Sequence, residues 1–418
     1  MTFSTPELAL GAACLLGAGF AVSRRWASRA PRVETTDEPK ETKKPLEHPD
    51  PDPLYDFDLA TAHTRNHIYV NKTLRFPYFQ TMAHQPMNIN DWIEIDKDLP
   101  WYIEEKQRVI KEQGKVVVDS LPENDDACAE ILELLVDYLP KRYPTLFESL
   151  SPNGIWNKVT NEKIPDITGK SGVDALLIVS RLVQDDFLMG REGPDGHIYF
   201  SGGLVAFPGF YLLSNYIGQP LEVIHRGVPH FNEKILKSVE RTLKRFGPHE
   251  SFERTSWTMV DDRNLFWHNM VTTNALPDGL QPKDIWLRMD HQTFRKLPRS
   301  KGIAFGVHVM MKRLEDLADS PLVPSLLAKI HLEADKDLMH HKLDDVYRDR
   351  MMPYLREMTQ SQLERGLIKE EDLDRVTDFR ELVKGRPIPN AQTTLSQPTE
   401  SEAQMMVHEQ PPTVVVNA

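Results

Sequence analysis

Several polar side chains are spaced so that they could act together in a binding site. Arg288, Asp290 and Gln292 alternate in LRMDHQTF, so on an extended strand all three point to one face. Three polar side chains among apolar neighbours are costly to bury unless they pair with something. They therefore either line a pocket or lie on an exposed outer face of a sheet, and the sequence leaves both possibilities open.

Two further clusters look like metal sites but have simpler explanations. His340 and His341 stand in DLMHHKLDD. Adjacent residues on a helix do not face one site, so we expect this pair to lie on a solvated helix. Asp56 and Asp58 form an acid pair of the kind that could hold a metal and a sugar nucleotide, but they lie at the edge of a proline-rich segment.

The cysteine count and the net charge exclude several classes of protein. Cys14 and Cys128 are the only cysteines in the sequence, so the chain cannot alone supply the roughly four thiolates of an iron–sulfur cluster. They also offer no disulfide framework, which fits a reducing compartment. The formal net charge of −12 argues against a nucleic-acid-binding protein, because such a protein needs a basic face.

The central part of the chain predicts an α+β domain. Amphipathic helices are expected at Asp126–Leu139 and Asn232–Phe246. Strands are expected in five runs: Ala175–Leu188, His197–Phe207, Phe252–Val260, Asp284–Phe294 and Gly302–Lys312. The turn Gly193–Gly196 joins the first two as a hairpin. This order of hairpin, helices and three strands suits an antiparallel sheet with inserted and flanking helices.

The two ends of the chain differ from this domain. Residues 6–22 contain the uncharged apolar run Leu8–Val22, and arginines follow it. Its 15 residues fall short of the roughly 20 of a comfortable span. The arginines nevertheless predict a single-pass transmembrane anchor with the main domain facing the cytosol, on the endoplasmic reticulum or the mitochondrial outer membrane. An organellar presequence is the alternative. We expect a disordered linker at 27–60, the main domain at 61–320, charged helices at 321–384 and a disordered tail at 385–418.

Five blocks of sequence, in order between about residues 90 and 315, form a specific set. They are Trp92–Ile110 (WIEIDKDLPWYIEEKQRVI), Tyr138–Phe147 (YLPKRYPTLF), 183–229 with VQDDFLMG, GGLVAFPGF and IGQPLEVIHRGVPHF, Arg254–Trp257, and Leu287–Ser300 (LRMDHQTFRKLPRS). The chain thereby resembles the haem-dependent oxidative N-demethylase alpha-subunit-like family, as a membrane-anchored member of fungal type.

The resemblance implies a PAS-like haem domain, with haem b as the cofactor. Members of the family oxidise small secondary amines with dioxygen, and separate flavin and iron–sulfur subunits pass the electrons. A division of labour of that kind agrees with the absence of cluster ligands in this chain. The resemblance therefore implies a reductase as protein partner and a small amine-like molecule as substrate.

An oxygen-activating haem needs a strong axial ligand, and neutral imidazole is the commonest suitable one. His225 is the candidate for the iron ligand, because it follows LEVI within the IHRGVP block and lies on the segment that connects strands. The alternatives are His291, His308, His230 and His197. Cys128 in DDACAE is a poor choice, because the neighbouring carboxylates disfavour a thiolate.

Further contacts follow from the same blocks. Arg254 could pair with a haem propionate, Trp257 could pack on the macrocycle, and Phe207 and Pro229 could wall the pocket; core packing is the alternative for the aromatic residues. As catalytic residues we expect Arg288 to hold a propionate or bound oxygen, Asp290 to pair with a cationic amine or relay a proton, and Gln292 to assist.

Three functions compete at this point. The first is a haem-dependent oxidoreductase that activates dioxygen and carries out oxidative N-dealkylation or a related monooxygenation. The second is a PAS-like haem or ligand sensor without turnover, and the third is a membrane-tethered glycosyltransferase. The family favours glutamate where Asp290 stands and often arginine where His291 stands. The shorter acid weakens the expectation of a small-amine substrate.

Overall fold

The structure is a computed structural model, and it describes residues 49–209, 211–261, 264–266 and 281–384. The expected anchor at 6–22, most of the linker at 27–60 and the tail at 385–418 lie outside these residues. Among the described residues, no helix is both long and apolar enough to cross a membrane.

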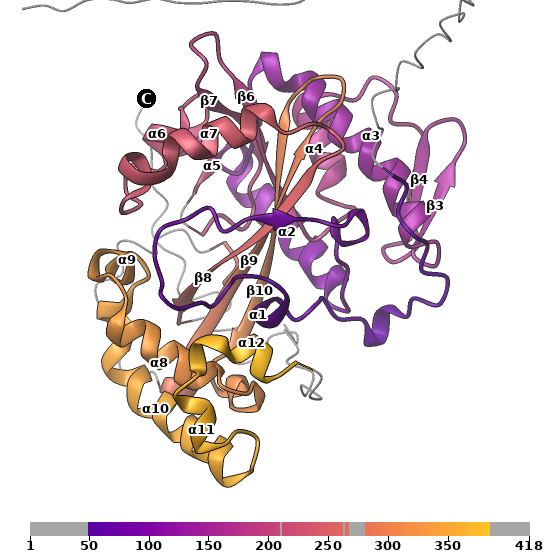
Figure 1. The fold of residues 1–418 in the computed structure, drawn as a ribbon. Coiled ribbons are helices and arrows are strands. Elements are labelled where there is room, and N and C mark those ends of the chain that lie inside the picture. Colours follow the sequence, from indigo (N-terminus) through magenta and orange to yellow (C-terminus); the bar gives the residue numbers. More distant parts are fainter. Residues whose placement is uncertain (1–48, 210, 262–263, 267–280, 385–418) are drawn as a thin grey trace, which may run out of the picture. The chain divides into compact units, whose positions relative to one another are not determined.

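A seven-stranded antiparallel sheet forms the centre of the fold (Figure 1). Its order is β1-β8-β9-β10-β6-β7-β2. The strands are β1 (Gln85–Pro86), β2 (Val118–Ser120), β6 (Asp186–Glu192), β7 (Ile198–Leu204), β8 (Ser251–Val260), β9 (Trp286–Lys296) and β10 (Ile303–Arg313). A separate three-stranded sheet contains β3 (Phe147–Leu150), β4 (Gly154–Asn157) and β5 (Glu162–Ile164). The predicted α+β class is confirmed.

The predicted order of elements is largely confirmed. The hairpin of β6 and β7 turns at Gly193–Gly196. The helical insertion follows it with α5 (Leu213–Tyr216), α6 (Leu221–Ile224), a π-helical turn (Phe231–Ile235) and α7 (Leu236–Arg245). The three long strands β8, β9 and β10 come next and pair over ten or eleven residues each.

One predicted strand is wrong in its first half. Within Ala175–Leu188, the residues up to Val179 belong to helix α4 (Gly172–Val179), and the strand begins only at Asp186. A short run of Leu, Ile and Val is apolar whether it forms a buried helix or a buried strand, so periodicity cannot distinguish the two. Burial decides the outcome, because Leu176 and Val179 pack with Ile131 and Leu135 of α3 (Asp125–Arg142) in one core cluster.

Different helices cover the two faces of the large sheet (Figure 1). On one face, Val239 and Leu243 of α7 pack with Phe294 and Ile303 of the sheet. On the other face lie α3, α4 and α2 (Leu99–Gln113), whose Tyr102 ring lies against His308. Alternation along β9 therefore sends Asp290 toward the α7 face and His291 toward the α2 face.

The C-terminal helices pack at one end of the long strands. They are α8 (Val323–Glu333), α9 (Lys336–His341), α10 (Asp344–Glu364), α11 (Glu370–Leu373) and α12 (Phe379–Leu382). Leu326 and Leu355 of these helices share a core cluster with Met259 and Leu287 of the sheet. The remaining helix, α1 (His67–Val70), joins the same cluster through Ile68.

Candidate functional site

A cavity of about 240 Å³ lies between the α7 face of the sheet and the helical insertion. Strands β6 to β10 line it on one side, and α6, α7, α9 and residues 75–82 line it on the others. Most of the lining is aliphatic or aromatic, with a few polar groups among it. Ligand sites of globular proteins have this composition, although their usual volumes are somewhat larger, at roughly 300–1,000 Å³.

His225 lines this cavity at the end of α6. Its Nδ1 lies 3.1 Å from the carbonyl oxygen of Leu221, one helical turn earlier. That contact places the proton on Nδ1 and leaves the Nε2 lone pair free to bind. The ring stacks on Phe231 with 4.0 Å between centroids. Burial lowers the pKa of His225 to about 4, so the imidazole is neutral at physiological pH.

Two arginines give the cavity a positive end. Arg254 lines the cavity from β8, and its buried Nε has no hydrogen-bond partner among the described residues. Arg75 also lines it, and its Nη atoms donate to the carbonyl oxygens of Lys72 and Phe79. Burial and the charge of Arg75 both lower the pKa of Arg254. A buried guanidinium without a carboxylate is costly, so this end is suited to an anionic ligand group.

Arg288, Asp290 and Gln292 all line the same cavity, which decides between the two possibilities that the sequence left open. Arg288 Nε donates to Asp290 Oδ1 over 2.9 Å, and Arg288 Nη2 donates to the Phe207 carbonyl oxygen over 2.8 Å. Gln292 stands opposite Arg254 in the β8–β9 register. The Asp290 side chain is 22% exposed, so its carboxylate is reachable from the cavity.

Gly209 makes the close approach to Arg288 possible. Its φ of +56° lies in the left-handed region that favours glycine. A Cβ atom at this position would stand 3.2 Å from Arg288 Nη2. The turn after β7 therefore needs glycine both for its backbone and for the space that Arg288 fills.

Two of the three other predicted contact residues line the cavity, and the third does not. Phe207 and Trp257 line the cavity and are 2% exposed. Trp257 packs against Tyr78 with 5.7 Å between centroids, and its buried Nε1 has no partner among the described residues. Pro229 is not among the residues that line the cavity, although its neighbour Val228 is.

A buried ion pair next to the cavity was not predicted. Lys106 of α2 is fully buried, and its Nζ lies 3.3 Å from Asp186 Oδ1. Asp186 lines the cavity, and its Oδ2 accepts the Phe207 backbone N–H over 2.6 Å. The sequence carried a signal for this pair, because Lys106 occupies the same apolar stripe of α2 as Leu99, Tyr102 and Ile103.

His341 corrects a second prediction. The pair His340–His341 was expected on a solvated helix, but only His340 is exposed, where it pairs with Asp345. His341 lines the cavity, and burial together with nearby Lys342 and His225 lowers its pKa to about 4. The premise that adjacent helical residues face different ways holds. The inward face of α9 is decided by the packing of Leu338 and Met339, which the local sequence does not reveal.

None of the alternative iron ligands lines the cavity. His197 pairs with Glu240 at 3.1 Å, and His230 lies 3.4 Å from Asp335. His291 and His308 are opposite one another on β9 and β10 and face α2. Asp56 and Asp58 lie away from the cavity as well, and Asp58 caps the helical turn Leu59–Thr61.

A comparison with protein-family models now identifies the chain. Residues 83–352 match the model of the haem-dependent oxidative N-demethylase, alpha subunit-like family. The chain belongs to this family. The matched range contains the whole large sheet, the helical insertion and α9, and so nearly all of the cavity. The resemblance drawn from the five sequence blocks is confirmed.

Proposed function

We propose that the cavity binds haem b and that the protein is a haem-dependent oxidoreductase which activates dioxygen for oxidative N-dealkylation or a related monooxygenation. Membership of the N-demethylase family supports the haem and the reaction class. The observation that carries the proposal is one cavity that combines a neutral, oriented imidazole at His225 with the buried Nε of Arg254, which has no hydrogen-bond partner among the described residues.

The residues that are present fit a haem. His225 Nε2 would bind the iron, and the Leu221 carbonyl oxygen would hold the ring as the outer partner of the ligand. Arg254 and Arg75 would pair with the propionates, which removes the cost of the unpaired Arg254 Nε. Phe207, Phe231 and Trp257 would supply apolar contacts to the macrocycle. The cavity of about 240 Å³ is small for this group, so its side chains would have to move apart on binding.

When bound, haem supplies the one-electron and dioxygen chemistry, with electrons from an external flavin and iron–sulfur reductase. The chain's own residues bind and orient the substrate. Asp290 would pair with a protonated amine or take its proton, and Arg288 would hold that carboxylate in place through the 2.9 Å contact. Gln292 offers an amide donor and an acceptor on the same face. The sheet with its inserted helices supports a PAS-like domain, and we retain the predicted membrane anchor as part of the proposal.

The first test is an absorption spectrum of the purified protein after expression with haem supplied. A Soret band is expected, and its absence would refute the haem assignment. His225→Ala should abolish or shift the band. His341→Ala is the matched control, because His341 is a neutral histidine of the same cavity, and an effect confined to this variant would move the ligand to α9.

Turnover distinguishes a haem-dependent oxidoreductase from a sensor. Haem-loaded protein supplied with a reductase, dioxygen and secondary amines should release an aldehyde. Asp290→Asn should lower kcat by roughly 10²–10⁴-fold if Asp290 handles a proton, while the Soret band stays unchanged. Haem binding without any aldehyde would instead favour the PAS-like sensor.

A further inference from the structure

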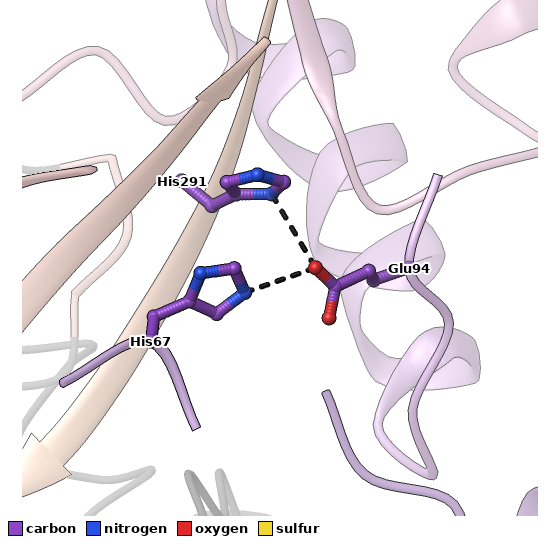
Figure 2. Close-up of side chains that lie close together, drawn as sticks. All are labelled: His67, Glu94 and His291. Carbon is purple, nitrogen blue, oxygen red and sulfur yellow. Dashed lines mark ion pairs between the residues drawn. The ribbon is translucent and has the colours of Figure 1, made fainter. Parts of the chain in front are cut away.

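Three buried side chains gather on the α2 face of the sheet, away from the proposed haem cavity (Figure 2). His67 comes from α1, Glu94 from the segment before α2, and His291 from β9. The side chains of His67 and His291 are each 1% exposed, and that of Glu94 is 8% exposed. These residues come from parts of the sequence that only the tertiary structure brings together.

Their spacing is that of a metal-ligand set. Glu94 Oε1 lies 3.0 Å from His67 Nε2 and 3.8 Å from His291 Nδ1, and the three ligand atoms lie within 4.8 Å of one another. Tetrahedral bonds of about 2.0–2.2 Å place neighbouring ligand atoms about 3.3–3.6 Å apart. The separations of 3.0 and 3.8 Å lie on either side of that range, so small side-chain rotations would bring all three ligand atoms to bonding distance of one ion.

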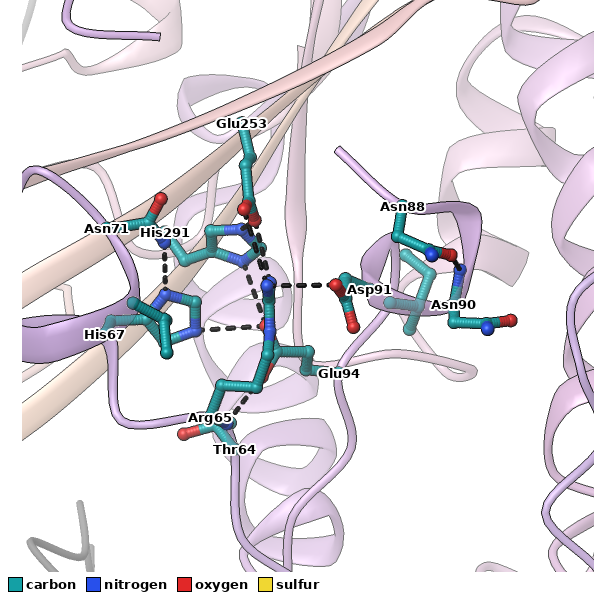
Figure 3. A network of polar contacts seen from close by, with 12 residues as sticks. Thr64, Arg65, His67, Asn71, Asn88, Asn90, Asp91, Glu94, Glu253 and His291 are labelled. Carbon is teal, nitrogen blue, oxygen red and sulfur yellow. Dashed lines mark hydrogen bonds and ion pairs between the residues drawn. The ribbon is translucent and has the colours of Figure 1, made fainter. Parts of the chain in front are cut away.

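Each histidine is also held on its far side, as metal-bound histidines usually are. His291 Nε2 lies 2.8 Å from Glu253 Oε2 (Figure 3). His67 Nδ1 lies 2.7 Å from the Asn71 amide nitrogen. Rotating the Asn71 amide by half a turn exchanges its nitrogen and oxygen, and its buried, unpaired Oδ1 would then accept a proton from Nδ1. Both rings then present their remaining nitrogen to Glu94.

A buried, unsatisfied atom points to a ligand independently of the spacing. His67 Nε2 has no hydrogen-bond partner of acceptable geometry among the described residues, although Glu94 Oε1 is near. A buried ring nitrogen left without a partner is costly. A metal ion between His67 and Glu94 would satisfy it.

The charges around the three residues also favour a cation. Glu94, Glu253 and Asp91 face one guanidinium, that of Arg65, so with neutral histidines the carboxylates exceed the cations by two (Figure 3). Arg65 is the competitor for Glu94, with Nη2 2.6 Å from Oε1. It also contacts Glu253 at 2.7 Å and Asp91 at 3.0 Å, so it could release Glu94 and keep two partners.

We propose that His67, Glu94 and His291 bind one divalent transition-metal ion, with Zn²⁺ or Fe²⁺ as the class that two imidazoles and a carboxylate select. The ion would tie α1, the segment before α2 and β9 together. Unlike the haem assignment, this inference does not depend on the proposed function.

The test uses the full-length protein, expressed in medium with added Zn²⁺ and also stripped with a chelator. We expect one equivalent of metal by elemental analysis and one site in a Zn²⁺ titration. Glu94→Gln and His291→Arg should each weaken Zn²⁺ binding by about 100-fold or more. His291→Arg places a guanidinium between Glu94 and Glu253 and should fold, which circular dichroism and Tm would check.

Two further variants decide the location and the role of Arg65. His230→Ala alters an exposed group, His230 with Asp335 and Asp337, that could hold a metal by itself, and it should leave Zn²⁺ binding unchanged. Arg65→Gln removes the competitor and should strengthen Zn²⁺ binding. Less than one equivalent of metal in the protein from Zn²⁺-supplemented medium, together with no site in the Zn²⁺ titration of the stripped protein, would overturn the proposal. Binding lost in His230→Ala but kept in His291→Arg would overturn it as well. None of these variants should change the Soret band, so the metal-site proposal and the haem proposal can fail independently of one another.

Discussion

Replacing Lys106 by methionine tests a fully buried charge. Lys106 is 0% exposed, and its ammonium donates to the carbonyl oxygens of Val183, Gln184 and Asp185 at 3.2, 3.0 and 2.6 Å. It also lies 3.3 Å from Asp186 Oδ1. Methionine preserves most of the volume but removes every one of these contacts.

The expected cost follows from what is left behind. Breaking a buried ion pair by removing one partner typically costs about 3–5 kcal/mol. Burial already raises the pKa of Asp186, and Lys106 is the largest opposing influence. Without Lys106 that pKa rises further, so Asp186 can take a proton and recover part of the loss at low pH. We therefore expect a loss of about 3–5 kcal/mol at pH 8 and a smaller loss at pH 5.5.

The pH dependence of this loss has a defined sign. A carboxyl group whose pKa is higher in the folded protein than in the unfolded chain favours folding below its unfolded value, near 3.9, and loses that contribution as the pH rises through its folded value. Lys106→Met raises the folded-state pKa of Asp186 and so widens the pH range between its unfolded and folded pKa values. The gap between variant and wild type should therefore grow steadily as the pH is raised.

Urea unfolding followed by circular dichroism measures the effect. The double variant Lys106→Met/Asp186→Asn removes both charges, and the amide oxygen that it introduces can still accept the Phe207 N–H. It should be more stable than the sum of the single effects by about 1–3 kcal/mol. Lys115→Met is the matched control, because Lys115 is 86% exposed and 3.9 Å from Asp119, and it should change stability by less than about 0.5 kcal/mol. A Lys106→Met loss below about 1 kcal/mol at pH 8, or simple additivity, would refute the reasoning.

Three further predictions concern the cavity and its surroundings. Arg254→Met should weaken haem binding but stabilise the haem-free protein by about 1–3 kcal/mol, because it removes a buried donor without a partner; haem titration and urea unfolding would show both effects, and a destabilised apoprotein would contradict the account. Gly209→Ala should lower the free energy of unfolding by more than about 1–2 kcal/mol, because alanine is strained at a φ of +56° and its Cβ would crowd Arg288. Gly218→Ala, at φ +80° with open space around it, should show the backbone cost alone, and equal effects would exclude the contact with Arg288. Burial raises the pKa of Asp185 to about 8, so its contribution to stability falls as the pH rises from about 4 to 8. The stability of Asp185→Asn relative to the wild type should therefore rise over that pH range in unfolding experiments. A stability difference that does not change with pH would contradict the raised pKa of Asp185.

Much of the fold could be predicted because its signals are local. The strands β8, β9 and β10 and the helices α3 and α7 each carry their own periodicity over ten or more residues, so neighbouring residues suffice to identify them. The turn at Gly193–Gly196 is equally local. The family was also recognisable from the sequence, since its blocks are short contiguous runs whose order survives without any knowledge of the structure.

Other features depended on contacts between distant segments. Whether Ala175–Val179 forms a helix was decided by packing on α3, and whether His341 faces solvent was decided by how α9 packs beside the cavity. The alternation of Asp290 and His291 was readable, but which face became a cavity and which a buried polar network depended on the helices that cover the sheet.

The sequence by itself determined the class of fold, the family and the set of polar residues on β9, because each of these depends on residue order and short-range periodicity. Only the tertiary structure decided which of the 15 histidines share a cavity and which meet a buried glutamate. His67 and His291 are separated by most of the domain in sequence, yet their rings lie 4.3 Å apart. No local pattern encodes that approach, because it results from strand register and helix packing acting together.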